Sequence, residues 1–141
     1  MHIPAQAAME RLFKALEARD TQKTLDCFAR DAFLFDPHYP KPDMRGHEEI
    51  RAGIEWGLSV MQRFHFTIVN VFAGRDGDSA AIEVDTSHVL KGGRELSFPQ
   101  VFVVETRGGL VTRLQAYEPY GPNGIGGLFL GVERLKRRLF G

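Results

Sequence analysis

The chain has 141 residues, with 18 Lys and Arg against 18 Asp and Glu, so its formal net charge is zero. This length suits one domain, because a domain of about 150 residues buries roughly two-thirds of the surface that its unfolded chain exposes. A hydrophobic fraction of 43% and a charged fraction of 26% lie near the globular average and exclude a disordered or collagen-like chain.

The charge balance and the single cysteine limit which partners the protein is expected to bind and in which cellular compartment it is expected to lie. A protein that binds nucleic acid through phosphates usually carries a basic surplus, so we expect no nucleic-acid partner. Cys27 is the only cysteine, which precludes an intrachain disulfide. The first residues lack the pattern of a signal peptide, and no run approaches the ~20 apolar residues of a membrane span. We therefore predict a cytoplasmic protein and do not expect a membrane among its partners.

Helical spacing dominates the first part of the chain. Apolar side chains recur at this spacing over 4–19 and again over 21–29, which predicts two helices. The period then changes to that of a short strand over 33–36. Three prolines within 37–42 cannot continue a strand or a helix, so Asp36 is predicted to lie where a strand passes into a loop.

A third helix begins at Gly46 and leads into a run of strands. The apolar stripe of this helix consists of Ile50, Ile54, Leu58 and Met61. Four strands follow, separated by glycine-rich turns, over 64–72, 80–90, 94–105 and 110–117. This order predicts an α+β fold, in which three helices pack on one face of a curved mixed or antiparallel sheet.

The C-terminal segment is a separate element. We predict a domain over 1–120 and an amphipathic basic extension over 121–141, which forms a helix. Its apolar face consists of Ile125, Leu128, Phe129, Val132, Leu135 and Leu139, and its basic face of Arg134, Lys136, Arg137 and Arg138. The extension could dock on the sheet, complete a dimer or contact an anionic surface. The first two are favoured, because a single basic helix binds lipid weakly.

Several segments share the residues and spacing of a known superfamily. They are Ala15-Leu16-Glu17-Ala18-Arg19-Asp20, Cys27-Phe28-Ala29-Arg30-Asp31-Ala32, Asp36-Pro37, Arg45-Gly46-His47-Glu48-Glu49-Ile50-Arg51 and the closing strand over 109–114. Together they resemble the NTF2-like superfamily, closest to its ketosteroid-isomerase and SnoaL-like polyketide-cyclase branches. The resemblance implies a cone of sheet around the helices, an apolar cavity that binds a small apolar ligand, and a homodimer. It predicts the fold better than the function, because unrelated activities occupy this cavity.

The resemblance to the steroid-isomerase branch implies a general base at Asp36, the aspartate before a proline. In that branch a tyrosine and a protonated aspartic acid stabilise the enolate oxygen. These two positions fall on Leu12 and Gln100, and a supporting tyrosine falls on Ile54. Because Leu12 and Ile54 donate no hydrogen bond, only Gln100 keeps a donor and the apparatus is incomplete.

Two interpretations of Asp36 and of His38 stay open. An aspartate that faces an apolar cavity has a raised pKa and could serve as a base. An aspartate at the start of a loop also commonly accepts hydrogen bonds as a turn residue. His38 could transfer protons at the rim of the cavity, or it could simply lie exposed in the loop.

His88 is a polar group on an apolar strand. Alternation along 80–90 places it on the face that we expect to line the cavity. It would lie opposite Phe98 and Gln100 if the connection over 91–95 is a five-residue loop, whereas a shorter loop would reverse this. His88 could assist catalysis or could be a satisfied structural histidine.

The end of the last strand offers a further candidate. The SnoaL-like branch has an acidic residue late in this strand, and Glu118 is the nearest acid here. Trp56, Tyr117 and Tyr120 can line or close the pocket with an aromatic face and one polar group. The remaining predicted lining residues are apolar: Leu12, Leu34, Ile54, Leu58, Phe98 and Phe102.

Motifs for metals and nucleotides fail along the chain. The run over 47–51 has Arg51 where a zinc-protease helix needs its second histidine, and one cysteine cannot build a structural zinc site. The glycines over 124–129 lack the third glycine of a dinucleotide turn. We therefore expect no cofactor and no metal.

These residues favour a cofactor-free acid/base enzyme of the isomerase, cyclase, lyase or hydrolase type. Its substrate would be a small, largely apolar molecule that carries an oxygen. Asp36 would move the proton, Gln100 would stabilise developing charge on oxygen, and His38 or His88 would assist. The alternative is a protein of the same fold that binds a hydrophobic ligand without turnover or serves as a dimeric scaffold.

Overall fold

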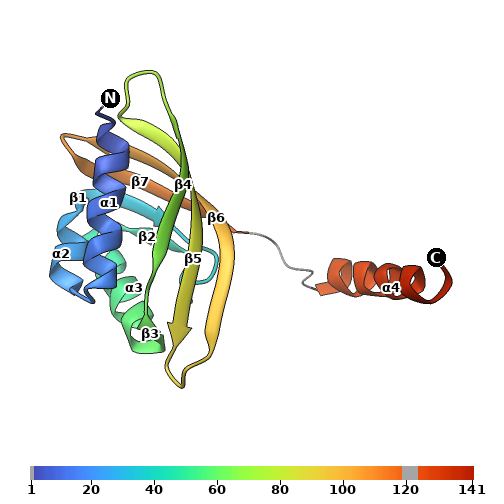
Figure 1. The fold of residues 1–141 in the computed structure, drawn as a ribbon. Coiled ribbons are helices and arrows are strands. Elements are labelled where there is room, and N and C mark those ends of the chain that lie inside the picture. Colours follow the sequence, from blue (N-terminus) through green and yellow to red (C-terminus); the bar gives the residue numbers. More distant parts are fainter. Residues whose placement is uncertain (1, 119–123) are drawn as a thin grey trace.

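A computed structural model describes residues 2–118 and 124–141 (Figure 1). Helix α1 spans Pro4–Glu17 and buries Ala8, Met9 and Leu12 on its inner side. Helix α2 spans Thr21–Asp26. Both helices are shorter than predicted. Arg19 takes a left-handed backbone conformation with φ of 59°, and this ends α1 before the predicted boundary.

The first strand begins much earlier than its local pattern indicates. Strand β1 spans Phe28–Phe35, and it runs parallel to the last strand, β7, over Leu110–Tyr117. Strand β2, over Asp43–Arg45, was not predicted and pairs antiparallel with the end of β1. Both differences have one cause, because this pairing depends on partners that are distant in the sequence.

Helix α3 spans Gly46–Val60, and the chain then forms two strands where we predicted one. Met61, expected on the helix stripe, instead begins strand β3 over Met61–Arg63. Strand β4 follows over Phe66–Ala73, after a break in which Phe64 turns into the core. Both strands pair antiparallel with β5, over Ser79–Leu90.

Strand β6, over Glu95–Arg107, completes a mixed sheet of order β2-β1-β7-β6-β5-β3, with β4 beside β5. His88 lies opposite Leu96, so the predicted pairing of His88 with Phe98 and Gln100 is wrong by two residues. The N–H of Leu90 donates to the carbonyl of Arg94, which closes a shorter loop. A shift of two residues leaves every side chain on its face, because side chains alternate with period two.

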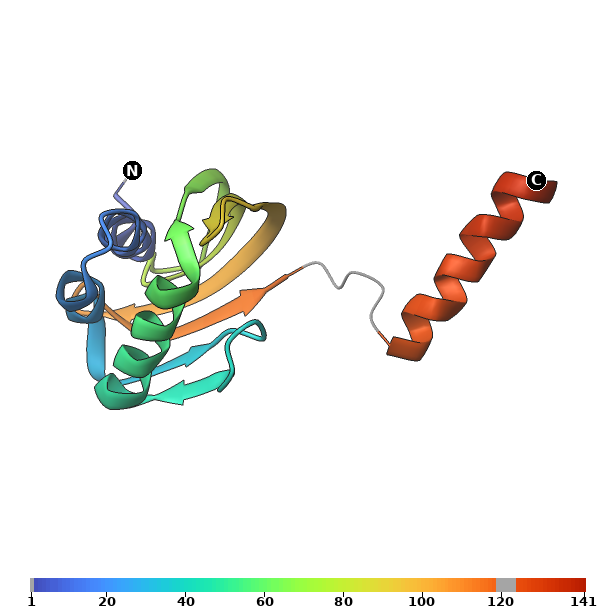
Figure 2. The same cartoon turned by 90° about the horizontal axis from the view of Figure 1, so that it is seen from below.

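The helices and the sheet enclose one apolar core. Figures 1 and 2 show α1, α2 and α3 on the same side of the curved, unclosed sheet. Helix α1 packs against β5 and β6, and α3 packs against β1. The predicted α+β class with three helices on a curved mixed sheet is therefore confirmed.

Helix α4 spans Gly124–Phe140 and lies apart from the sheet in both views (Figures 1 and 2). Its described apolar side chains are exposed, and they include Leu128 at 72%, Leu135 at 55% and Leu139 at 65%. Within 2–118 and 124–141, no helix is long and apolar enough to cross a membrane.

Candidate functional site

A cavity of about 500 Å³ lies between the helices and the inner face of the sheet. Its wall is dominated by hydrophobic side chains, as is usual for small-molecule sites. The aromatic members of the wall are Phe13, Phe28, Tyr39, Trp56, Phe64, Phe66, Phe98 and Phe102.

Most of the residues predicted from the sequence border this cavity. All four catalytic candidates do so, namely Asp36, His38, His88 and Gln100. Seven of the predicted binding residues also line it: Leu12, Leu34, Ile54, Trp56, Phe98, Phe102 and Glu118.

Two predicted lining residues lie elsewhere. Leu58 is partly buried against the hydrophobic core and does not reach the cavity wall. Tyr117 is 45% exposed and borders a second hollow of about 340 Å³, together with Glu83 and Asp85. Alternation explains its position, because Tyr117 points to the face opposite the buried Ala116. Tyr120, also predicted, lies outside the described residues.

The end of β1 directs Asp36 toward the cavity. The backbone N–H of Asp36 donates to the carbonyl of Pro42 at 3.0 Å, which closes the proline loop. Its carboxylate Oδ1 accepts the N–H of His38, also at 3.0 Å. The same side chain therefore serves as a turn residue and lines the cavity.

Burial raises the pKa of Asp36 above its ordinary value, because a charged carboxylate is poorly solvated in an apolar site. The N–H of His38 and the charge of its ring act in the opposite direction and are the smaller effects. A raised pKa makes this carboxylate a stronger base than an exposed aspartate.

Glu118 and His38 meet Asp36 at the edge of the cavity. The Glu118 side chain is 6% exposed, and its Oε2 contacts Nδ1 of His38, whose side chain is 64% exposed. One candidate metal-ligating atom from each of Asp36, His38 and Glu118 lies within 4.8 Å of the other two. We expected no metal from the sequence, whereas these three residues, which the fold brings together, form a group that could hold a metal ion.

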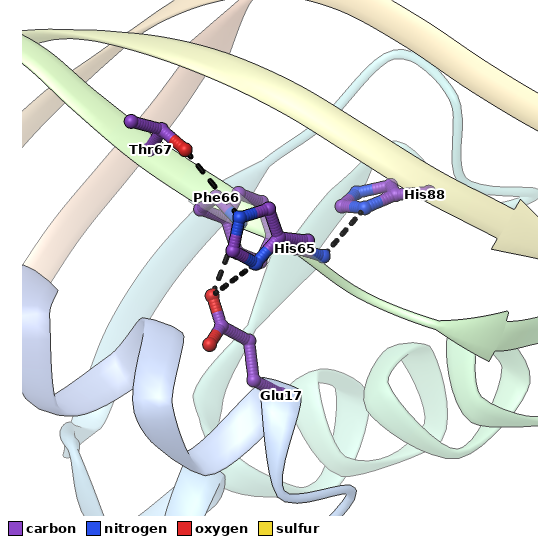
Figure 3. A network of polar contacts seen from close by, with 5 residues as sticks. All are labelled: Glu17, His65, Phe66, Thr67 and His88. Atoms are coloured by element: carbon purple, nitrogen blue, oxygen red, sulfur yellow. Dashed lines mark hydrogen bonds and ion pairs between the residues drawn. The ribbon is translucent and has the colours of Figure 1, made fainter.

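His88 is held by a polar network at the back of the cavity (Figure 3). Its Nδ1 accepts the backbone N–H of His65 at 3.2 Å. The carboxylate of Glu17, at the end of α1, accepts the N–H of Phe66 at 3.1 Å and so fixes the start of β4. The ring of His88 packs edge-on against Phe64, with 4.9 Å between the ring centroids.

This environment keeps His88 neutral. Burial lowers its pKa from 6.5 to about 4, because the protonated imidazole loses its solvation. Since Nδ1 accepts a hydrogen bond, the proton of the neutral ring is on Nε2. His88 can therefore donate a hydrogen bond at neutral pH.

Gln100 keeps the donor that the sequence led us to expect and adds a buried acceptor. Its Nε2 donates to Oγ1 of Thr86 at 2.5 Å, which uses one of the two amide N–H groups. The other amide atom, Oε1, is buried and has no hydrogen-bond partner among the described residues. A buried acceptor without a partner is costly, so a ligand with an N–H or O–H group would be favoured here.

Sequence reasoning missed Tyr39, which folds from the proline loop over α3. Its ring lies 5.4 Å from that of Trp56, and burial raises the pKa of its hydroxyl. Gly57 makes this approach feasible, because a Cβ there would stand 3.3 Å from the Tyr39 hydroxyl. The only local signal is a pair of glycines four residues apart, Gly53 and Gly57, on one face of the helix.

The fold recurs in solved structures. A protein of ketosteroid isomerase-like fold from Catenulispora acidiphila, in complex with trimethylamine, is 23% identical with a TM-score of 0.70, over 81% of this chain and 86% of that chain. A Mycobacterium tuberculosis protein in complex with estradiol-17beta-hemisuccinate is 20% identical with a TM-score of 0.74, over 84% and 96%. The Delta 5-3-ketosteroid isomerase from Mycobacterium sp. is 19% identical with a TM-score of 0.73, over 82% and 93%.

These identities are low, so the likeness shows the fold alone. A search of the curated proteins finds no match. The sequence itself matches a family model, the SnoaL-like domain, over residues 9–114. This range runs from α1 into β7 and contains nearly all of the cavity wall, Glu118 excepted. The chain therefore belongs to the family of SnoaL-like domain proteins.

Proposed function

We propose that the protein is a cofactor-free acid/base enzyme of the isomerase, cyclase, lyase or hydrolase type. Its substrate is a small, largely apolar molecule that carries a carbonyl or similar oxygen. The observation that carries the proposal is the carboxylate of Asp36, which lines an apolar cavity and has a raised pKa. Asp36 accepts a proton from a carbon atom beside the substrate oxygen and returns it to another position.

The neutral ring of His88 suits the stabilisation of developing charge on that oxygen. His88 lines the cavity, and because its Nδ1 accepts the N–H of His65, its Nε2 carries the donor proton. We assign this role to His88 in place of Gln100, because one of the two amide N–H groups of Gln100 already donates to Thr86. His38, exposed and in contact with Glu118, suits exchange of protons with solvent.

Two solved structures of the same fold, in complex with estradiol-17beta-hemisuccinate and with trimethylamine, support a small ligand in this cavity. A third is named as an isomerase. This chain differs from the steroid-isomerase branch at two expected donor positions, because Leu12 and Ile54 have no hydroxyl group. The reaction we propose therefore uses another donor than the steroid-isomerase branch does.

The experiment that tests the base is exchange of carbon-bound protons for deuterium in D₂O. A panel of apolar ketones is incubated with the protein, and exchange beside the carbonyl is followed by NMR. Replacement Asp36→Asn should lower the exchange rate about a hundredfold or more. The melting temperature at neutral pH should be equal or higher, because a carboxylate with a raised pKa opposes folding when it ionises.

The matched control is Asp85→Asn, an exposed residue on the outer face of the sheet. It should leave the exchange rate unchanged. Equal exchange by wild type and Asp36→Asn would remove Asp36 from the mechanism. If the wild type and both variants bind a ligand but none catalyses exchange, the second candidate is favoured, a hydrophobic-ligand-binding protein or dimeric scaffold. The lack of hydroxyl groups at Leu12 and Ile54 also supports this candidate.

We further propose that residues 1–120 form the SnoaL-like unit and that the protein is a homodimer. The exposed apolar side chains of α4 support an interaction that the single chain does not satisfy. The cytoplasmic location stays a prediction.

A further inference from the structure

The cavity carries two carboxylates on its wall. Asp36 and Glu118 line it, and none of the described lining residues is Lys or Arg. Of the two histidines on the wall, His88 is kept neutral by burial. An anionic ligand would therefore meet two carboxylates and find no fixed cation in return.

Glu118 is a buried acid, and none of the described residues on the cavity wall beside it is Lys or Arg. Its carboxylate is almost fully buried, and its Oε2 contacts Nδ1 of His38, which lies in an exposed loop. The carboxylate of Asp36 lies within 4.8 Å, so the two acids repel each other when both are ionised. A cation placed beside Glu118 would offset this repulsion and the loss of solvation.

Gln100 adds an independent observation that favours an N–H donor in the cavity. This residue is 6% exposed and lines the same cavity, and its Oε1 has no hydrogen-bond partner among the described residues. An N–H donor on the ligand would satisfy it. The rings of Tyr39 and Trp56 also line the cavity, and aromatic faces attract an ammonium group that has left water.

We propose that the cavity binds a lipophilic amine, whose ammonium group lies at the Glu118 carboxylate and whose apolar part fills the aromatic interior. His38 then leaves Glu118 for solvent, which its exposed position permits. This inference deepens the proposed function, because it uses the same cavity and names the class of its ligand. Asp36 remains the base, and Glu118 is a binding residue.

The test is a matched series of three ligands that share a phenylalkyl chain and differ in the head group and its charge: phenylbutylamine, phenylbutanol and phenylbutyrate. Their affinities for the full chain are measured by calorimetry at neutral pH. EDTA is present, so that no divalent ion occupies the three candidate ligand atoms. We expect the amine to bind about tenfold or more tighter than the alcohol, and the acid to bind weakest.

A smaller preference for the amine over the alcohol, or tighter binding of the acid, overturns the proposal. Failure of the amine to bind also overturns it. None of these results bears on deuterium exchange of a neutral ketone that depends on Asp36, so the ligand class and the proposed function can fail separately.

A variant assigns the preference to one residue. Glu118→Gln keeps the size of the side chain and removes its charge, so the ratio of alcohol to amine dissociation constants should fall close to one. Glu95→Gln, which removes an exposed carboxylate at the start of β6, should keep the wild-type ratio. If Glu118→Gln keeps that ratio too, the ammonium is held elsewhere and the assignment is wrong. Circular dichroism checks that both variants are folded.

Discussion

Asp36 combines two roles that its sequence context presents as alternatives. Its Oδ1 accepts the N–H of His38 as a turn residue does, and the side chain also lines the apolar cavity. The hydrogen bond favours the charged carboxylate and burial favours the neutral acid, and burial is the larger effect. The turn therefore sets the direction of the carboxylate while the cavity sets its basicity.

His88 leads to a prediction on the pH dependence of stability. Its pKa is about 4 in the folded protein, against 6.5 for an unperturbed histidine. Between these values the unfolded chain binds a proton that the folded chain excludes. The contribution of His88 is thus complete above pH 6.5 and decreases as the pH falls toward 4, by about 3 kcal/mol. Urea unfolding at several pH values measures this slope.

Replacement His88→Gln should flatten the slope. Glutamine does not titrate, and its side-chain oxygen can accept the N–H of His65 in place of Nδ1. His2→Gln, at an exposed histidine, should leave the slope as it is in the wild type. The same acid sensitivity in His88→Gln and in the wild type would assign the titration to another group.

The candidate site could be predicted from the sequence only where its residues carry local signals. Asp36 stands between a strand pattern and a proline loop, and the alternation around His88 indicates its face. The contact between His38 and Glu118 has no such signal, because it joins a loop after β1 to the end of β7. Gln100 has no such signal either, because its amide is oriented by the hydrogen bond from Nε2 to Oγ1 of Thr86, a residue on the adjacent strand.

At the scale of the elements, Arg19 joins the end of α1 to the end of α3. Its guanidinium donates to the carbonyls of Leu58 at 2.7 Å, Met61 at 2.7 Å and Gln62 at 3.0 Å. These carbonyls lie at the carboxyl end of α3 and in β3, where helical partners are missing. Since Met61 borders the cavity, Arg19 helps to fix one end of its wall.

Replacement Arg19→Ala should lower the free energy of unfolding by about 1–2 kcal/mol, because the three hydrogen bonds that the exposed guanidinium donates are lost. Arg19→Gly loses the same bonds, but glycine tolerates the left-handed φ of 59°. The glycine variant should therefore be about 1 kcal/mol more stable than the alanine variant. Urea unfolding measures both.

A matched control is Arg75→Ala, in an exposed turn, which should unfold as the wild type does. Equal stabilities of Arg19→Ala and Arg19→Gly would show that the backbone at this position does not keep its left-handed conformation.

Elements that are determined by residues close in the sequence were predicted accurately, whereas elements that depend on distant partners were not. The strand over 110–117 has the predicted boundaries, since a glycine pair precedes it and the apolar Leu114 and Ala116 alternate with polar residues in its second half. Strand β2 has three residues and exists through its pairing with β1. The break at Phe64 is also set by packing, because this side chain is buried in the interior.

At the scale of the whole molecule, the outer face of the sheet and α4 are complementary. Phe72 is 58% exposed and Val69 is 50% exposed on β4, and Glu83 and Asp85 lie on the adjoining strand. Neither acid has a cation within 4.0 Å among the described residues. A helix with an apolar stripe and flanking arginines can cover such a face with matching charges.

The last prediction concerns the part of α4 in the proposed homodimer. A chain that ends at Pro119 lacks the apolar stripe of Leu128, Val132, Leu135 and Leu139, four side chains at helical spacing that are at least 44% exposed. We expect light scattering to give the mass of a dimer for the full chain and of a monomer for the shortened one. Leu128→Ser with Leu135→Ser should act like the truncation, whereas Glu133→Ser, off the stripe, should not. A shortened chain that remains dimeric would show that the sheet face suffices without α4.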